Sequence, residues 1–317
     1  MASEAAMQLA QASSWATQWQ DLFYFLVGIS VFFSVLIFGS IFYFAIKYRR
    51  RSKDEIPPRI EDNLALEITW TVIPTGLCVV MFIWASGLFF RNSRPPAASS
   101  EIFVIAQQWM WKVQHPEGVQ EIDELHVPVG VPIKLTMTSQ DVIHDFGVPA
   151  LRIKKDVLPG RYTSEWFTAT ETGRFHLFCD QYCGTSHSAM VGWVIVMEPT
   201  EYARWLSGGV ASKSMADVGA QLYAQYGCDT CHSTGTGPSF AGLYGSLVEV
   251  TNSQTVVADD AYIRKSILNP SSQRAAGYAS VMPTFQGQLG EEQILQLTAY
   301  IKSLAKQESE GRKVAKQ

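Results

Sequence analysis

The segment RFHLFCDQYCGTSHSAMVGWVIVM, residues 174–197, places a cluster of soft ligands between two apolar runs. The runs, residues 174–178 and 192–197, have the length and composition of short β-strands. The loop between them has the spacing C-x3-C-x3-H-x2-M, with candidate ligands at Cys179, Cys183, His187 and Met190. Thiolates, imidazoles and thioethers are ligands suited to copper or zinc. The segment therefore predicts a metal-binding loop held between two strands.

The surrounding residues 97–199 predict an all-β domain. Short apolar or alternating runs are separated by Pro, Gly and Asp, which is typical of a β-sandwich or Greek-key barrel. The runs are residues 101–113, 133–138, 164–167, 174–178 and 192–197. His144 lies 35 residues before Cys179. End loops of neighbouring strands come together, so folding could bring His144 to the metal loop.

Two alternatives to a copper site remain open for this loop. Cys179 and Cys183 could form a disulfide on an oxidising face of a membrane. Two Cys and two His could also hold a structural zinc ion. Met190 argues against zinc, because a thioether is a familiar weak axial ligand for copper.

Two uncharged runs precede this domain, at residues 22–46 and 68–90. A helix of 25 residues spans roughly 37 Å, more than the hydrocarbon core of about 30 Å. The loop at 47–63 carries six Lys or Arg residues, whereas residues 1–21 carry none. By the positive-inside rule, the loop is cytoplasmic and both termini lie outside. Residues 1–96 thus predict a hairpin in a bacterial inner membrane, with the following domains on the periplasmic side.

A second motif lies near the C-terminus. Cys228, Cys231 and His232 form C-x-x-C-H, the attachment signature of c-type haem. The alternative, a thioredoxin-type C-x-x-C, lacks βαβ surroundings here. Met282, 50 residues after His232, is the candidate second axial ligand, and a Met ligand raises the reduction potential of a haem. With a helix before the motif and an amphipathic helix at the C-terminal end, residues 215–306 predict an all-α haem domain.

Together, the metal loop, His144, the hairpin and the β-domain resemble cytochrome c oxidase subunit II over about residues 15–200. The stretches that carry the resemblance are QWMW at 108–111, EITWTVIP at 67–74, HDFGVP at 144–149 and PGR at 159–161. Residues 215–306 resemble a small class I cytochrome c. The chain therefore resembles subunit II with a cytochrome c fused to its C-terminus, and the implied fold of the β-domain is a cupredoxin-like Greek-key barrel.

The resemblance assigns a role to each ligand candidate. It implies that Cys179 and Cys183 bridge the two coppers of the binuclear centre called CuA. It also implies that His144 and His187 bind one copper each, and that Met190 and the carbonyl of Gln181 are weak ligands. Many family members have Glu in place of Gln181, and that carboxylate helps to bind magnesium at the border with subunit I. Gln181 therefore disfavours a magnesium ligand from this chain.

The resemblance also implies roles for Trp109, as the point where an electron enters, and for Glu67, at the mouth of a proton channel in subunit I. Each has a structural alternative. Trp109 and Trp111 are two residues apart, so we expect them to share one face of a strand and to pack or anchor there. Glu67 opens the second helix, where a negative charge is favourable.

The predicted order of parts is a membrane segment 1–96, a CuA domain 97–199, a linker 200–214, a cytochrome c domain 215–306 and a charged tail 307–317. The remaining histidines, taken as structural or solvated, are His115, His126 and His176. We expect Cys78, in the second membrane helix, to be a buried and inert thiol. The chain has 25 Lys and Arg against 29 Asp and Glu, a net charge of −4. That charge argues against bulk capture of nucleic acid.

These features predict the subunit through which electrons enter a haem–copper terminal oxidase. Electrons would pass from its own haem c to CuA and on to subunit I, which would reduce oxygen to water and translocate protons. The expected partners are subunit I, subunit III and an electron donor, either an upstream quinol-oxidising complex or a cytochrome c. The alternatives are the corresponding subunit of a CuA-type nitric oxide reductase and a membrane-anchored copper-binding or delivery protein.

Overall fold

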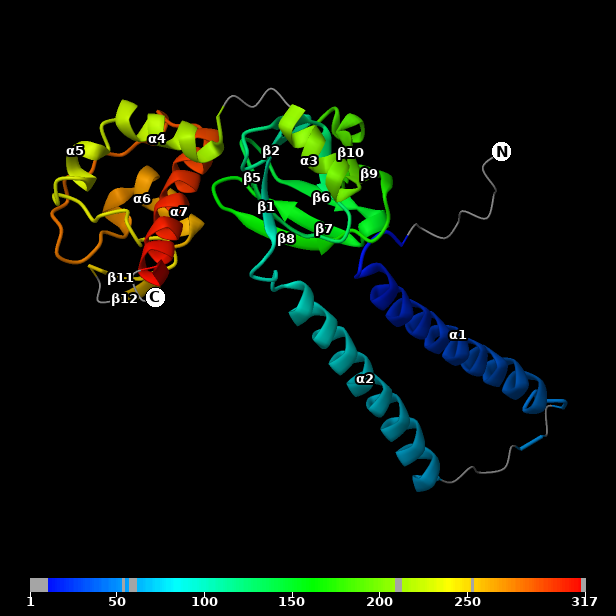
Figure 1. Ribbon diagram of the computed structural model, residues 1–317. Helices are drawn as coiled ribbons and strands as arrows, with labels where there is room; N and C mark the ends of the chain where they lie inside the picture. The colour runs from blue at the N-terminus through cyan, green and yellow to red at the C-terminus, as the bar shows by residue number, and fades with distance from the viewer. Residues whose placement is uncertain (1–10, 53–54, 57–61, 209–212, 252–253, 315–317) are drawn as a thin grey trace. The chain divides into compact units, whose positions relative to one another are not determined.

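Figure 1 shows the chain as a computed structural model. The structure describes residues 11–52, 55–56, 62–208, 213–251 and 254–314. Of these residues, 14–94 form one compact unit, and 11–13 with those between 95 and 314 form the other.

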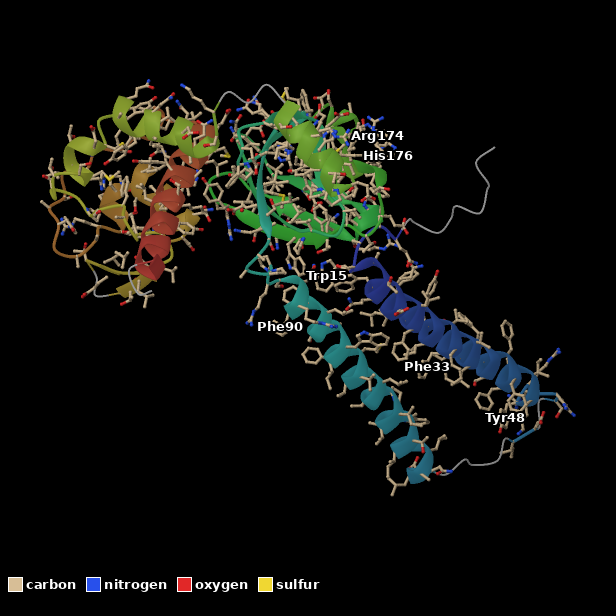
Figure 2. The ribbon with its side chains drawn as sticks, in the orientation of Figure 1. Trp15, Phe33, Tyr48, Phe90, Arg174 and His176 are labelled. Atoms are coloured by element: carbon tan, nitrogen blue, oxygen red, sulfur yellow. The ribbon has the colours of Figure 1, made fainter. Side chains whose placement is uncertain are left out.

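The first unit is a pair of long helices, α1 (Ala16–Lys47) and α2 (Leu64–Asn92). Both are long and apolar enough to cross a membrane, which confirms the two predicted helices. Their side chains are exposed along almost the whole length, as Figure 2 shows for Phe90 of α2. The helices contact each other through Phe25 and Trp84, whose ring centroids lie 5.5 Å apart. Apolar surface of this extent requires lipid or partner helices around it.

The β-domain contains ten strands in two sheets. They are β1 (Ser100–Gln107), β2 (Met110–Gln114), β3 (Gln120–Ile122), β4 (Glu124–Pro128), β5 (Pro132–Ser139), β6 (His144–Val148), β7 (Ile153–Val157), β8 (Thr163–Thr168), β9 (Gly173–Cys179) and β10 (Val191–Met197). One sheet has the order β3-β2-β1-β5-β8 and the other β4-β10-β9-β6-β7. The β1–β5 and β10–β4 pairs are parallel, whereas the other pairs are antiparallel. This mixed two-sheet arrangement confirms the predicted cupredoxin-like fold.

The predicted single run 101–113 is two strands joined by a turn. β1 pairs with β2 in antiparallel register, with Gln107 opposite Met110. Trp109 therefore lies in the turn, while Trp111 lies in β2 and is fully buried. The prediction that the two tryptophans share one strand face was wrong, because Gln108 and Trp109 form the turn itself, without Gly or Pro to mark it.

The segment after the β-domain begins with a helix, α3 (Pro199–Gly208), where a linker was expected over 200–214. That prediction was wrong for residues up to 208; residues 209–212 lie outside the described part of the chain. The other elements are the short 3-10 helices η1 (Pro149–Leu151), η2 (His187–Ala189) and η3 (Pro270–Ser272), the helices α4 (Met215–Gln225), α5 (Asp229–His232), α6 (Asp260–Leu268) and α7 (Glu291–Val314), and the hairpin β11 (Leu247–Val250) and β12 (Gln254–Val257).

The cytochrome-like domain is built on helices α4, α6 and α7. Ser214 and Asp217 form a complete capping box at the start of α4. Gly219 of α4 lies where a Cβ atom would come 2.0 Å from the backbone oxygen of Gln296 in α7, so the two helices cross in close contact. Buried apolar residues from all three helices make the core, as the sequence periodicity predicts; among them are Leu222, Ile263, Ile267, Ile294, Leu297 and Ile301. α7 continues to Val314, through most of the predicted tail.

Candidate functional site

The metal loop connects two paired strands, β9 and β10. The strands bring the ends of the loop together, and the amide of Cys179 donates to the carbonyl of Met190 at 3.2 Å. Within the loop, the amide of His187 donates to the carbonyl of Gly184 at 3.1 Å. Gly184 has φ +121°, a conformation that favours glycine. Backbone hydrogen bonds therefore fix the loop before any ligand is considered.

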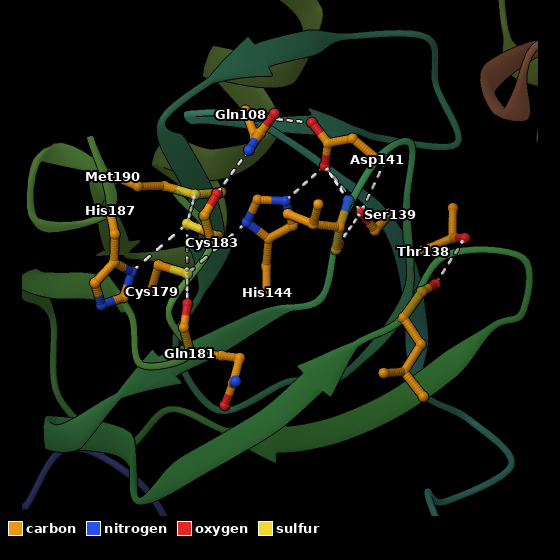
Figure 3. Close-up of polar contacts among 12 residues, drawn as sticks. Gln108, Thr138, Ser139, Asp141, His144, Cys179, Gln181, Cys183, His187 and Met190 are labelled. Carbon is orange, nitrogen blue, oxygen red and sulfur yellow. Dashed lines mark hydrogen bonds and ion pairs between the residues drawn. The ribbon is translucent and has the colours of Figure 1, made fainter. Parts of the chain in front are cut away.

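All six predicted copper-site residues come together at this loop, as Figure 3 shows. The two cysteine sulfurs lie 3.7 Å apart. The remaining distances are 3.5 Å from Cys183 Sγ to His187 Nδ1, 3.8 Å from Cys183 Sγ to Met190 Sδ, 3.2 Å from Cys179 Sγ to the Gln181 carbonyl oxygen and 3.9 Å from Cys179 Sγ to His144 Nδ1. Both cysteines are free thiols, and their separation is well beyond a disulfide bond of about 2.05 Å.

His144 is oriented by residues that the sequence analysis did not single out. Its Nε2 lies 2.8 Å from Asp141 Oδ1, which leaves Nδ1 facing Cys179. The other oxygen of Asp141 accepts from the backbone amide of Gln108 at 2.7 Å. The side-chain amide of Gln108 in turn donates to the carbonyl of Cys183 at 2.7 Å. Such outer partners set the orientation and the tautomer of a ligating histidine.

The two thiols differ in acidity. Burial raises the pKa of both, but a hydrogen bond with His144 brings the pKa of Cys179 down to about 6. Burial and the neighbouring Cys179 raise the pKa of Cys183 to about 12. Cys179 is thus the more acidic of the two thiols. Because metals bind the thiolate form, metal binding at this loop would release the proton of Cys183.

Trp109 lies against the metal loop. A Cβ atom placed on Gly184 would come 3.2 Å from the Trp109 ring, so the indole packs directly on the loop backbone. Glu67 lies in the first turn of α2, and its amide donates to the carbonyl of Asn63 at 3.0 Å. That position fits the favourable charge at a helix N-terminus.

The cytochrome-like domain contains a cavity of about 420 Å³. The predicted haem residues Cys228, Cys231, His232 and Met282 all line it, among mainly apolar neighbours. His232 Nδ1 donates to the carbonyl of Pro238 at 2.7 Å. The second nitrogen of His232 is left for an axial bond, so the residues present fit a c-type haem.

The β-domain gathers paired thiols, two imidazoles and a thioether, and the C-terminal domain has a cavity lined by the C-x-x-C-H motif. Together with the two apolar helices, these features define a membrane-anchored electron-transfer protein that uses copper and haem. The family models agree with this class. Residues 2–88 match the transmembrane domain of cytochrome c oxidase subunit II, residues 117–199 match its periplasmic domain and residues 216–305 match cytochrome c. The chain belongs to the cytochrome c oxidase subunit II family, whose members are subunits of haem–copper oxidases.

Individual relatives carry the same name. The chain is 32% identical to cytochrome c oxidase subunit 2 of Alkalihalophilus pseudofirmus, over 86% of this chain and 82% of the relative. It is 29% identical to cytochrome c oxidase subunit 2 of Cereibacter sphaeroides, over 62% of this chain and 77% of the relative. The crystal structure of the periplasmic domain of subunit II of cytochrome oxidase of Bradyrhizobium japonicum is 31% identical. That match covers 37% of this chain and 96% of the solved one, with a TM-score of 0.36.

Proposed function

We propose that this chain is the subunit through which electrons enter a haem–copper terminal oxidase, passing from its own haem c to the binuclear copper centre and on to subunit I. The observation that carries the proposal is the separation of 3.7 Å between two free, buried thiols, with an imidazole beside each sulfur. Reduction of oxygen to water and proton translocation would take place in subunit I.

Six residues would hold the copper pair. Cys179 and Cys183 would bridge the ions, His144 and His187 would bind one each, and Met190 with the Gln181 carbonyl would be weak ligands. Two coppers that share two thiolates would supply a one-electron carrier with little structural change. The contribution of the chain is to bury the ligands and fix their directions through the strand pairing. The amide side chain of Gln181 disfavours a magnesium ligand from this position.

Four residues would hold the haem. The thiols of Cys228 and Cys231 would attach it covalently, and His232 and Met282 would be the axial ligands. The hydrogen bond from His232 to Pro238 fixes the orientation of the ring. A methionine ligand favours a high reduction potential, which suits a carrier that feeds an oxidase.

The orientation and the partners follow from the same proposal. The basic loop after α1 would lie in the cytoplasm, and both metal domains would lie in the periplasm of a bacterial cell. Subunit I and subunit III would be the membrane partners, and a quinol-oxidising complex or a cytochrome c would be the donor. Glu67 would lie at the mouth of a proton channel in subunit I.

The first test is a metal and haem assay of the purified full-length chain, with optical spectra. We expect two coppers and one covalently attached haem per chain. Cys179→Ser should abolish the copper absorption and leave the haem spectrum unchanged. Zinc in place of copper, or a single copper per chain, would contradict the proposal.

The second test concerns Trp109, which we propose as the point where the electron reaches the copper loop. Its contact with Gly184 supports this role. Trp109→Phe should slow reduction of the copper centre by the haem without changing the copper spectrum. Trp193→Phe, in β10, is the matched control. Equal rates in the two variants would remove Trp109 from the proposed path.

A further inference from the structure

A second cluster of chelating side chains lies in the β-domain outside the copper loop. His115 follows β2, Glu121 lies in β3 and His126 lies in β4. His115 Nε2 is 2.7 Å from Glu121 Oε1, and His126 Nδ1 hydrogen bonds to the other oxygen, Glu121 Oε2. The exposed fractions of the three side chains are 0%, 7% and 11%, so neither histidine is solvated. By contrast, His176 is exposed at the surface of the domain, where Figure 2 labels it.

Helix α3 covers this cluster. The hydroxyl of Tyr202 lies 3.0 Å from His115 Nδ1, on the side of the ring away from Glu121. The Trp205 ring stacks on His126 with a centroid separation of 4.4 Å, and it meets the edge of His115 at 5.2 Å. The helix therefore shields the cluster from water and gives His115 an outer hydrogen-bond partner.

A second carboxylate lies beside Glu121 and His126. Ligand atoms of Glu121, Glu124 and His126 lie within 4.8 Å of one another. Glu124 is paired with Arg174 at 3.5 Å, but both side chains are about half exposed, so this contact is weak and easily exchanged. One imidazole and two carboxylates are donors that zinc accepts, with a water as the fourth ligand, and the two carboxylates would balance its charge.

We propose that Glu121, Glu124 and His126 form a second metal site for a divalent ion of the zinc class, with His115 holding the Glu121 carboxylate in place. The ion would tie β3 to β4, at the surface on which α3 packs through Tyr202 and Trp205. Because α3 is the segment that follows the last strand, the site would fix the start of the connection to the cytochrome-like domain. Metal-binding energy at such a site adds to the stability of the folded state.

The surroundings of the cluster accommodate both the metal-free and the metal-bound state. Without an ion, the ring N–H groups of His115 and His126 donate to the Glu121 carboxylate. With an ion, Nδ1 of His126 must offer its lone pair, so that ring carries its proton on Nε2. His115 keeps its hydrogen bond to Glu121 Oε1, and its Nδ1 accepts from the Tyr202 hydroxyl. His115 therefore holds the Glu121 carboxylate in place in both states.

The test uses the full-length, haem-loaded chain with Cys179→Ser and Cys183→Ser, so that the copper loop does not compete. Titration with Zn²⁺ alone should show one tight site, and Co²⁺ should give the absorption of a tetrahedral complex. Adding Glu121→Gln should weaken zinc binding by about 100-fold or more. The matched control is His176→Gln, which replaces an exposed histidine of the same domain and should leave zinc binding unchanged.

A second variant keeps the test decisive if Glu121→Gln fails to fold, as judged from the haem spectrum and the thermal midpoint. Tyr202→Phe preserves the shape of α3 and removes only the outer partner of His115. It should weaken zinc binding by about 10-fold. The proposal is overturned if the titration of the parent chain shows no tight zinc site. It is also overturned if the affinity is the same in the parent and in whichever of these variants folds.

Discussion

Replacing Asp141 tests whether the copper ligands depend on partners beyond the metal. Asp141→Ala removes the acceptor of His144 Nε2 at 2.8 Å and of the Gln108 amide at 2.7 Å. His144 is completely buried, so its Nε2–H would be left without a partner in place of this contact. The ring could then turn, or move its proton to Nδ1, the nitrogen that faces Cys179.

The expected effect is a weaker copper site in an otherwise intact protein. Loss of an outer partner of a ligating histidine lowers metal affinity by about 10- to 100-fold, which corresponds to about 1.4 to 2.8 kcal/mol. Asp141→Asn should have a smaller effect. Its amide oxygen can still accept from His144, while its NH₂ group would face the Gln108 N–H and lose that hydrogen bond.

The assay is competition between the full-length chain and a copper chelator, followed by the copper absorption, with the haem band as internal standard. Glu171→Gln is the control, because it neutralises an exposed carboxylate of the same domain. The order of affinity should be control, then Asp141→Asn, then Asp141→Ala. If Asp141→Ala binds copper as tightly as the control does, the outer hydrogen bonds do not support the site.

Three further outcomes follow from the same structure. Gly237→Ala would place a Cβ atom 3.1 Å from the His232 ring. We therefore expect less haem per chain and a shifted haem reduction potential. An unchanged haem content and an unchanged potential would show that the ring can move freely. Gly219→Ala would place a Cβ atom 2.0 Å from the Gln296 backbone oxygen, which should destabilise the cytochrome-like domain by about 1–3 kcal/mol, measured by thermal unfolding. Turnover through the attached haem should change little between low and moderate ionic strength, because tethering replaces electrostatic capture of a donor; a steep fall would count against delivery within one chain.

The sequence predicted which side chains meet at the copper loop, because most of them share one short stretch. The spacing from Cys179 to Met190 and the resemblance to a known family named this set, and its role as the copper ligands stays a prediction. The structure adds the outer partners, Asp141 and Gln108. Asp141 stands three residues before His144, a spacing that could have drawn attention to it. Gln108 contacts Asp141 across 33 residues and Cys183 across 75, and no local pattern encodes contacts of that range.

Helix α3 was missed for a related reason. A helix of 10 residues is marginal by itself, and glycines at its end favoured the prediction of a linker. Its stability comes from tertiary contacts, in which Tyr202 and Trp205 pack on His115 and His126. His115 and Tyr202 are 87 residues apart in the sequence. The segment is nevertheless amphipathic in the sequence itself, with Tyr202 and Trp205 three residues apart on one helix face, and this signal could have identified the helix.

The structure of the copper loop supports its proposed role in one-electron transfer. Cys179 and Cys183 are only 7% and 3% exposed, and the Cys183 carbonyl and the Cys179 amide are held by hydrogen bonds to Gln108 and Met190. These contacts involve protein atoms alone, so the ligand directions are set by the fold. A site fixed in this way changes little when the charge of its occupant changes by one. Rigidity of this kind favours rapid one-electron transfer, and it would be a disadvantage for a delivery protein that must open to release its metal.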